Sequence, residues 1–283
     1  MTIAVGFRCT NGVVLATDSQ VSQDIAKTTG QKIFPIWSNG EHGMTLAGAG
    51  PTDHMKAIVR DIRVSLQNSI GQRETSSAEI QQVVEDTLAP FYAKHIDGAP
   101  PELRGALEVG FMAGIWTRRE GAKLFSVCRT TITEVPYYQC IGAGSYLTEY
   151  ISEAICPKGR HSVNQTVALA AYIVWAAKKY VESCGGYTSV RALLDNGEDV
   201  RVDNREIGDV EEYMVGLFQF FGSMVGFLGD SFSPGQIDMG PYAEILKKQV
   251  VECRDKQAVY RDLERKRKAT LEEFRKKRES SEK

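Results

Sequence analysis

Residues 2–19 read TIAVGFRCTNGVVLATDS and carry the clearest local fold signal in the chain. Two apolar segments rich in β-branched residues lie on either side of Asn11-Gly12. An Asn-Gly pair between two such segments is a strong hairpin signal, because both residues accept the positive φ angles of a tight turn. We therefore expect a strand at 2–8, a turn, and a second strand that begins at Val13.

Beyond residue 19 the pattern first stays β-like and then turns helical. Strands are predicted where apolar residues run between turn signals, and helices where apolar residues recur at every third or fourth position. In chain order, the further predicted elements are strands at 32–37 and 44–48, helices at 52–68 and 76–92, strands at 107–116, 123–128 and 138–141, helices at 145–155 and 163–181, a hairpin of 190–194 and 198–202, and a helix at 209–228. Groups of strands followed by groups of helices indicate a layered α+β sandwich and not alternating β-α-β units.

Three helix boundaries are predicted from local residue types. Thr52 or Asp53 is expected to cap the helix at 52–68, and Ser76 or a neighbouring hydroxyl residue the helix at 76–92. Pro100-Pro101 is expected to end the helical region that contains residues 76–92.

Composition argues against several classes of protein. The chain has 283 residues, of which 42% are hydrophobic and 25% charged, and its net charge is −2. These values fit a soluble globular protein with a large core and argue against a globally basic nucleic-acid binder. The longest apolar stretches are short for a membrane span, and the N-terminus has no basic segment of a signal peptide. We expect a cytoplasmic protein with neither a membrane nor a nucleic acid among its partners.

The sequence suggests neither a metal nor an organic cofactor. The six cysteines form no CxxC pair, and the four histidines are scattered without an HExxH motif. A chain of this size needs no disulfide to fold, so we read the cysteines as reduced thiols.

The last part of the chain differs in composition from the rest. Residues 247–283 contain 14 Lys and Arg against 8 Asp and Glu and few large apolar residues. We therefore expect a main domain at 1–240 and a charged helical extension at 241–283. The extension is either a solvated helix or a basic arm that docks a partner.

Thr2 is the first candidate for chemistry. Because it follows Met1 and is small, removal of Met1 would leave a chain that begins with Thr. A terminal Thr carries a hydroxyl nucleophile and an α-amine whose pKa of about 7.7–8 leaves part of it as a neutral base near pH 7. The amine can take the hydroxyl proton directly or through one water.

Asp18 and Lys32 are the second and third candidates. Asp18 follows a predicted strand one hairpin away from the N-terminus, and Lys32 opens the next strand. A lysine beside the terminal amine would lower the pKa of that amine, and Asp18 would hold the lysine in place. The alternatives are that Asp18 caps a turn and that Lys32 is a solvated strand end.

The order of these residues resembles a known family. The segments that carry the resemblance are Thr2–Gly6, Gly12–Ser19, Gln31-Lys32-Ile33 and Leu46–Gly50. Together they resemble the proteasome β-subunit family of N-terminal-nucleophile hydrolases, over roughly residues 2–205. The resemblance implies a four-layer αββα sandwich, in agreement with the predicted order of strands and helices.

The same resemblance implies roles for individual residues. Thr2 would be the nucleophile with its own α-amine as the base, and Asp18 and Lys32 would support it. The Gly48 N–H would donate to the oxyanion. The implied reaction is hydrolysis of an amide through an acyl-enzyme, and the implied assembly is a homo-oligomeric ring that encloses a polypeptide substrate. An ATPase or another protein would be a further partner.

The chain departs from the family pattern at three supporting positions. Gly142-Ala143-Gly144 stands where the family has Gly-Ser-Gly, so the nearest hydroxyl is that of Ser145. Val181 and Cys184 stand where the family has Asp and Ser. These departures indicate a divergent relative of bacterial type.

We therefore expect a threonine peptidase with catalytic residues Thr2, Asp18, Lys32, Gly48 and Ser145. Two alternatives stay open: an inactive structural homologue, and an N-terminal-nucleophile hydrolase that acts on a small amide. The walls of the substrate pocket are expected around Gln20–Ile25 and Ala47–Pro51.

Overall fold

The computed structural model describes residues 2–23, 26–38, 40–156 and 161–216, together with scattered positions between 240 and 262. The chain divides into two compact units, Met1–Ile207 and Gly208–Lys283. Residues 204–216 are helical, while the remainder of the helix predicted at 209–228 and most of the extension at 241–283 lie outside the described residues. The domain boundary expected at residue 240 stays a prediction. None of the described helices is long and apolar enough to cross a membrane.

The first sheet contains the N-terminal hairpin predicted from the Asn-Gly turn. Its order is β10-β1-β2-β11-β12, and every neighbouring pair is antiparallel. The strands are β1 (Ile3–Arg8), β2 (Gly12–Asp18), β10 (Tyr138–Gly142), β11 (Thr188–Leu194) and β12 (Asp199–Arg201). The Cys9 N–H closes the hairpin by donating to the Gly12 carbonyl at 2.8 Å.

The second sheet has the order β5-β6-β7-β8-β9 and is also antiparallel throughout. Its strands are β5 (Ile33–Ser38), β6 (His42–Ala49), β7 (Gly110–Thr117), β8 (Gly121–Cys128) and β9 (Thr131–Glu134). A separate hairpin of β3 (Gln20–Gln23) and β4 (Ala26–Thr29) connects the two sheets in the sequence. This hairpin and β9 were not predicted, because each strand is four residues long and has at most one large apolar residue.

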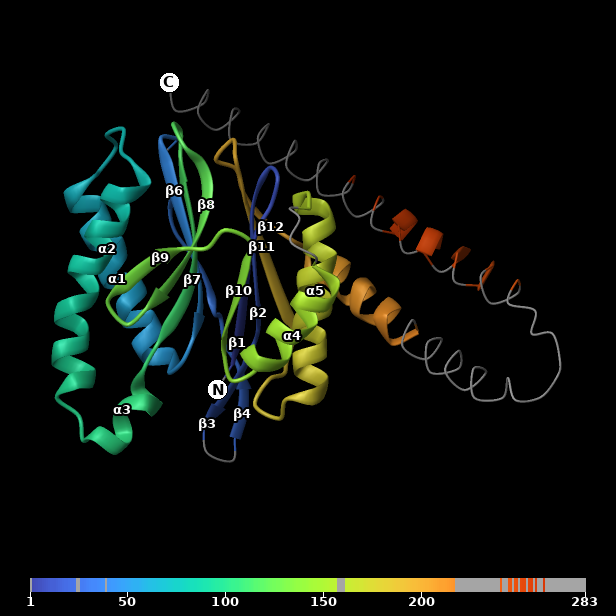
Figure 1. Cartoon of the computed structure of the whole chain (residues 1–283), viewed down its shortest axis with the longest axis horizontal. Helices are drawn as coiled ribbons and strands as arrows, with labels where there is room; N and C mark the ends of the chain where they lie inside the picture. The colour runs from blue at the N-terminus through green and yellow to red at the C-terminus, as the bar shows by residue number, and fades with distance from the viewer. Residues whose placement is uncertain are drawn as a thin grey trace, which may run out of the picture. The chain divides into compact units, whose positions relative to one another are not determined.

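Helices cover the outer face of each sheet. Figure 1 shows α1 (Thr52–Ser69) and α2 (Ser77–Tyr92) beside the β5–β9 sheet, and α4 (Ser145–Ile155) and α5 (Val163–Tyr180) beside the other. The predicted four-layer αββα sandwich is therefore confirmed.

Local chemistry explains which predictions of the helix ends are right and which are wrong. Ser76 caps α2 in a capping box with Glu79, as expected. The expected cap of α1 was wrong, because Pro51 holds the N-cap position with extended backbone and Thr52 and Asp53 already lie inside the helix. Pro101, which was expected to mark the end of a helical region, is also the first residue of a new helix.

A π-helix (Ala93–Asp97) follows α2, and α3 (Pro101–Leu107) then begins at Pro101 itself. Proline suits the first position of a helix, where its missing N–H would have no partner. The strand expected from residue 107 accordingly begins at Gly110.

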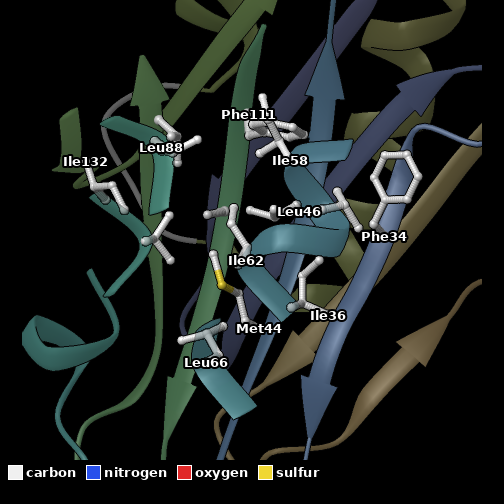
Figure 2. Packing of buried hydrophobic residues seen from close by; sticks show 14 of the residues in the cluster. Phe34, Ile36, Met44, Leu46, Ile58, Ile62, Leu66, Leu88, Phe111 and Ile132 are labelled. Atoms are coloured by element: carbon white, nitrogen blue, oxygen red, sulfur yellow. The ribbon is translucent and has the colours of Figure 1, made fainter. Parts of the chain in front are cut away.

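Two of the apolar cores lie against the β5–β9 sheet, one on each of its faces. Figure 2 shows Ile62 and Leu66 of α1 packed against Met44 of β6, and all three side chains are almost fully buried. The second core lies between the sheets and includes Ala4, Val13 and Leu15 from one sheet with Ala47, Met112 and Leu124 from the other. The two sheets therefore pack directly against each other at β1.

Candidate active site

The backbone around Thr2 is fixed by the strands on both sides of β1. The Thr2 carbonyl accepts a hydrogen bond from the Ala143 N–H, just after β10, at 2.9 Å. On the opposite side, the Ile3 N–H donates to Asp18 Oδ1 at the end of β2, at 3.2 Å. Thr2 is 2% exposed, so its hydroxyl is held in a buried and defined place.

Three of the predicted catalytic residues meet at this hydroxyl. The Thr2 hydroxyl donates to Asp18 Oδ1, and Lys32 Nζ donates to Thr2 Oγ1. Lys32 Nζ also donates to Asp18 Oδ1 at 2.8 Å. Although Thr2, Asp18 and Lys32 come from three different segments, the structure places their functional atoms in one cluster.

Both oxygens of the Asp18 carboxylate are occupied. Oδ1 accepts from Thr2, Ile3 and Lys32, and Oδ2 accepts from the Gly185 N–H at 3.0 Å. The side chain is fully buried. A charged carboxylate is tolerated in such a place only when it is paired and hydrogen-bonded, and Asp18 meets both conditions.

Lys32 Nζ has three acceptors. The third is the backbone carbonyl of Gln20. Burial lowers the pKa of Lys32, and the Asp18 carboxylate acts in the opposite direction. Because three acceptors match the three N–H groups of an ammonium, this geometry is that of a charged Lys32. A positive charge in this place can stabilise negative charge on the Thr2 oxygen.

The cluster lies at the wall of a cavity of about 990 Å³. Five of the expected wall residues line it, namely Gln20, Val21, Ala49, Gly50 and Pro51, whereas positions 24 and 25 lie outside the described residues. The other walls were not predicted. They come from the first turn of α1, from the end of α3 and the residues that lead into β7, from β8 and its following turn, and from β10, and include Asp53, His54, Ala106, Glu108, Ser126, Cys128, Arg129, Gln139 and Ile141.

The Gly48 N–H, which is expected to donate to an oxyanion, has a backbone acceptor in this structure. It donates to the Lys32 carbonyl at 2.8 Å, as part of the pairing of β5 with β6. A Cβ at Gly48 would lie 2.5 Å from the Met55 sulfur and 2.8 Å from Phe111, so packing requires a glycine here. In this arrangement the Gly48 N–H is engaged with the Lys32 carbonyl, and its role towards an oxyanion stays a prediction.

The catalytic role expected for Ser145 stays a prediction. Ser145 is the first residue of α4, and its carbonyl accepts from the Thr148 hydroxyl at 3.0 Å. Among the described residues, no hydrogen bond joins Ser145 to Thr2, Asp18 or Lys32, and Ser145 is not one of the cavity residues. Ala143 lines the cavity instead and brings no hydroxyl.

The two remaining departures from the family pattern are buried. Val181 follows α5, where its N–H donates to the Ala177 carbonyl at 2.8 Å. Cys184 is 4% exposed, and burial raises the pKa of its thiol to about 11. Cys184 is therefore a neutral thiol at pH 7 and not a nucleophilic thiolate.

Sequence reasoning missed two groups that touch the cluster. They are the Gln20 carbonyl and the Gly185 N–H, and both belong to the backbone. No residue type predicts that a backbone group will take part in a site, although Gly185-Gly186 is an evident turn signal. Within the described part of the chain, no group of three or more His, Cys, Asp or Glu residues could hold a metal ion.

Solved bacterial structures share this fold. The ancestral beta-subunit Anbu from Yersinia bercovieri is 16% identical, with a TM-score of 0.63 over 84% of this chain and 100% of that chain. A Gly-1 mutant of Anbu from Hyphomicrobium sp. strain MC1 is 17% identical, with a TM-score of 0.62 over 84% of this chain and 99% of that chain. At such identities the likeness demonstrates the fold alone.

The amino-acid sequence gives the family. None of the curated proteins that were compared matches the chain. A model of the proteasome subunit family, however, matches residues 2–190, which is well over half of the chain and includes every residue of the Thr2 cluster. The chain therefore belongs to the proteasome subunit family.

Proposed function

We propose that this chain is a threonine-type peptidase of the proteasome β-like class, with Thr2 as its nucleophile. The observation that carries the proposal is the meeting of Thr2 Oγ1, Asp18 Oδ1 and Lys32 Nζ at the wall of the large cavity. A nucleophile, a charged donor and an acceptor in mutual contact beside a cavity are the parts that amide hydrolysis needs.

The reaction begins once Met1 has been removed and the α-amine of Thr2 is free. The amine takes the hydroxyl proton while Thr2 Oγ1 attacks the carbonyl carbon of the peptide bond. The amine then returns the proton to the leaving nitrogen, and an ester joins the acyl part of the substrate to Thr2. A water hydrolyses this ester and restores the free hydroxyl.

Lys32 and Asp18 prepare the nucleophile without leaving their places. The Lys32 ammonium stabilises the negative charge that develops on Thr2 Oγ1. Asp18 keeps that ammonium charged although it is buried, since it lies 2.8 Å from Nζ. Neither group needs water to do so, because both side chains are almost completely excluded from solvent.

The cavity has room for several residues of a peptide substrate. Its volume of about 990 Å³ is near the upper end of the roughly 300–1,000 Å³ typical of small-molecule sites. Apolar walls at Val21, Ala49 and Ile141 adjoin polar ones at Ser126 and Gln139. A mixed wall of this size suits several residues of an extended polypeptide.

We further propose that copies of the chain assemble into a homo-oligomeric ring in the cytoplasm, with the cavities facing an inner chamber. Support comes from membership of the proteasome subunit family. An ATPase or another protein would then deliver unfolded polypeptide to the chamber. Native mass spectrometry of the purified protein tests the ring, because a monomeric chain would contradict it.

The first test of the nucleophile is the intact mass of the protein before and after incubation with a threonine-directed peptide electrophile. We expect loss of Met1 and one adduct, which peptide mapping places on Thr2. Thr2→Ala is the matched control and should take no adduct.

Four results would contradict the proposal. Retained Met1, or a free Thr2 that takes no adduct, would identify an inactive structural homologue. An adduct at another residue would mean that Thr2 is not the nucleophile. Acylation of Thr2 with turnover of small amides but not of unfolded protein would identify a small-amide hydrolase.

A further inference from the structure

We propose that Ser19 is a positioning residue for Thr2 chemistry, because it joins the connection between β2 and β3, which Asp18 and Gln20 flank, to the turn at Gly185–Tyr187. This inference rests on the proposed function, since it concerns how the acylation of Thr2 is supported. Among the described residues, no hydrogen bond joins Ser19 to Thr2 and Ser19 does not line the cavity, so we expect it to act through its neighbours.

Four hydrogen bonds connect residues 18–20 with residues 185–187, and we call this set the Ser19 clasp. The Ser19 and Gln20 N–H groups both donate to the Gly185 carbonyl, at 3.2 and 3.0 Å. The Tyr187 N–H donates to Ser19 Oγ at 2.9 Å, and the Gly185 N–H donates to Asp18 Oδ2 at 3.0 Å. Ser19 is 1% exposed, so water cannot replace these partners.

The two segments approach each other closely at the two glycines. A Cβ at Gly185 would lie 2.2 Å from Gln20 Oε1, and one at Gly186 would lie 2.3 Å from Ser19 Oγ. Gly186 also has a φ of 72°, which residues with a side chain rarely adopt. The Ser19 clasp therefore depends on a turn shaped to fit it.

The clasp reaches the nucleophile through Lys32. Of the three acceptors around Lys32 Nζ, Asp18 Oδ1 and the Gln20 carbonyl belong to the residues on either side of Ser19. A shift of the chain at Ser19 displaces both acceptors together and, with them, the ammonium that faces Thr2 Oγ1. Misplacement of a reacting group by about 1 Å lowers the rate of reaction by up to a hundredfold.

The test compares Ser19→Ala with Ser152→Ala in the full-length protein after removal of Met1. Ser152 is an equally buried serine of α4, and its hydroxyl donates to the Thr148 carbonyl at 2.6 Å. The measurements are the acylation rate constant of Thr2 with a peptide electrophile, the affinity of the preceding noncovalent complex, and the melting temperature.

We expect Ser19→Ala to lower the acylation rate constant about tenfold, which corresponds to a barrier increase of about 1.4 kcal/mol, and to change the noncovalent affinity less than twofold. Ser152→Ala should leave the acylation rate constant and the noncovalent affinity within twofold of those of the unmodified protein. Its loss of melting temperature should be comparable to that of Ser19→Ala. Ser19→Cys keeps a side chain of similar shape with a weaker acceptor, so an intermediate rate is expected. It also serves as the test variant if Ser19→Ala does not fold.

The pH dependence of acylation gives a readout that a general loss of stability does not move. Lys32 Nζ is faced by the Asp18 carboxylate, the Thr2 hydroxyl, the Gln20 carbonyl and, farther away, the Cys184 thiol. If the clasp loosens, the ammonium loses acceptors and its pKa falls further. The alkaline limb of the acylation profile should therefore move to lower pH in Ser19→Ala and stay unchanged in Ser152→Ala.

The possible failures are distinguishable. If the unmodified protein acylates at Thr2 and Ser19→Ala does so at the same rate, the positioning role is wrong while the proposed function stands. An equal fall of the rate in Ser152→Ala would likewise overturn the positioning role. A chain that never acylates at Thr2 would overturn both proposals.

Discussion

At the scale of single residues, the Asp18–Lys32 ion pair determines what substitutions around Thr2 will do. The two side chains are 0% and 2% exposed, so each charge depends on the other for compensation. Burial makes such a pair a weak source of net stability, but removing one partner leaves an uncompensated charge inside the protein.

We predict that Asp18→Asn and Lys32→Met each lower the free energy of unfolding by about 3–5 kcal/mol. The double variant Asp18→Asn/Lys32→Met should lose clearly less than the two single losses together, because it buries no unpaired charge. Urea unfolding of the four proteins measures this coupling. Strict additivity of the two losses would show that the pair is not energetically linked.

The Lys32 pKa gives a second prediction at this scale. Burial lowers it from the ordinary value of 10.5, so the unfolded chain binds more protons than the folded one between the lowered pKa and 10.5. Stability contributed by this group therefore rises as pH rises through that window. The unfolding free energy of the unmodified protein minus that of Lys32→Met should increase with pH there. A flat difference would contradict the lowered pKa.

At the scale of elements, Glu120 holds the start of α2 to the turn between β7 and β8. Its carboxylate accepts from the Ser77 N–H at 3.1 Å, from the Ser77 hydroxyl at 2.6 Å and from Lys123 Nζ at 2.6 Å. Burial opposes the charge of Glu120, but these bonds lower its pKa from 4.5 to about 2. The carboxylate is thus a cap supplied by a different element.

We predict that Glu120→Gln costs roughly 1–2 kcal/mol of stability at neutral pH, in the range of a lost helix cap. Because the folded pKa is lowered, the contribution of Glu120 is present above 4.5 and is lost as pH falls from there towards 2. The stability difference between the two proteins should therefore shrink across this range. A difference that does not change with pH would rule out the charged cap.

Elements with strong local signals were predictable from the sequence, and those defined by tertiary contacts were not. The bounds of α4 match the prediction, Ser145–Ile155, since periodicity and the preceding glycines agree there. The β3–β4 hairpin was missed because its short strands lack an apolar pattern.

The candidate site shows the same limit. Thr2, Asp18 and Lys32 were found because their residue types and order are informative. The Gln20 carbonyl and the Gly185 N–H were not, since any residue has a carbonyl and nearly any has an N–H. The engagement of the Gly48 N–H in the sheet likewise follows only from the register of β5 with β6.

At the scale of the whole molecule, the site belongs to the first of the two compact units. The groups that contact Thr2, and all residues that line its cavity, lie within Met1–Ile207. They come from both sheets and from α1 and α3, so the cavity exists only in the assembled sandwich.

We predict that a chain ending at residue 240 still takes one adduct at Thr2, at a rate within about twofold of the full chain. The measurement is intact mass over time with the same peptide electrophile, with Thr2→Ala as the control. Loss of the adduct in a folded shortened protein would show that the residues after 240 contribute to the site.

The bond from the Gly185 N–H to Asp18 Oδ2 also has a consequence for biosynthesis. The two residues are separated by 167 positions. The turn that contains Gly185 lies next to Asp18 only when β11, which follows it, has paired with β2. A chain still being translated therefore contains Thr2 and Asp18 from the start. The Gly185 N–H that binds the Asp18 carboxylate is added only when nearly two thirds of the protein has been made. If Thr2 is the nucleophile proposed above, this order of events leaves the site incomplete until the fold that contains it has formed.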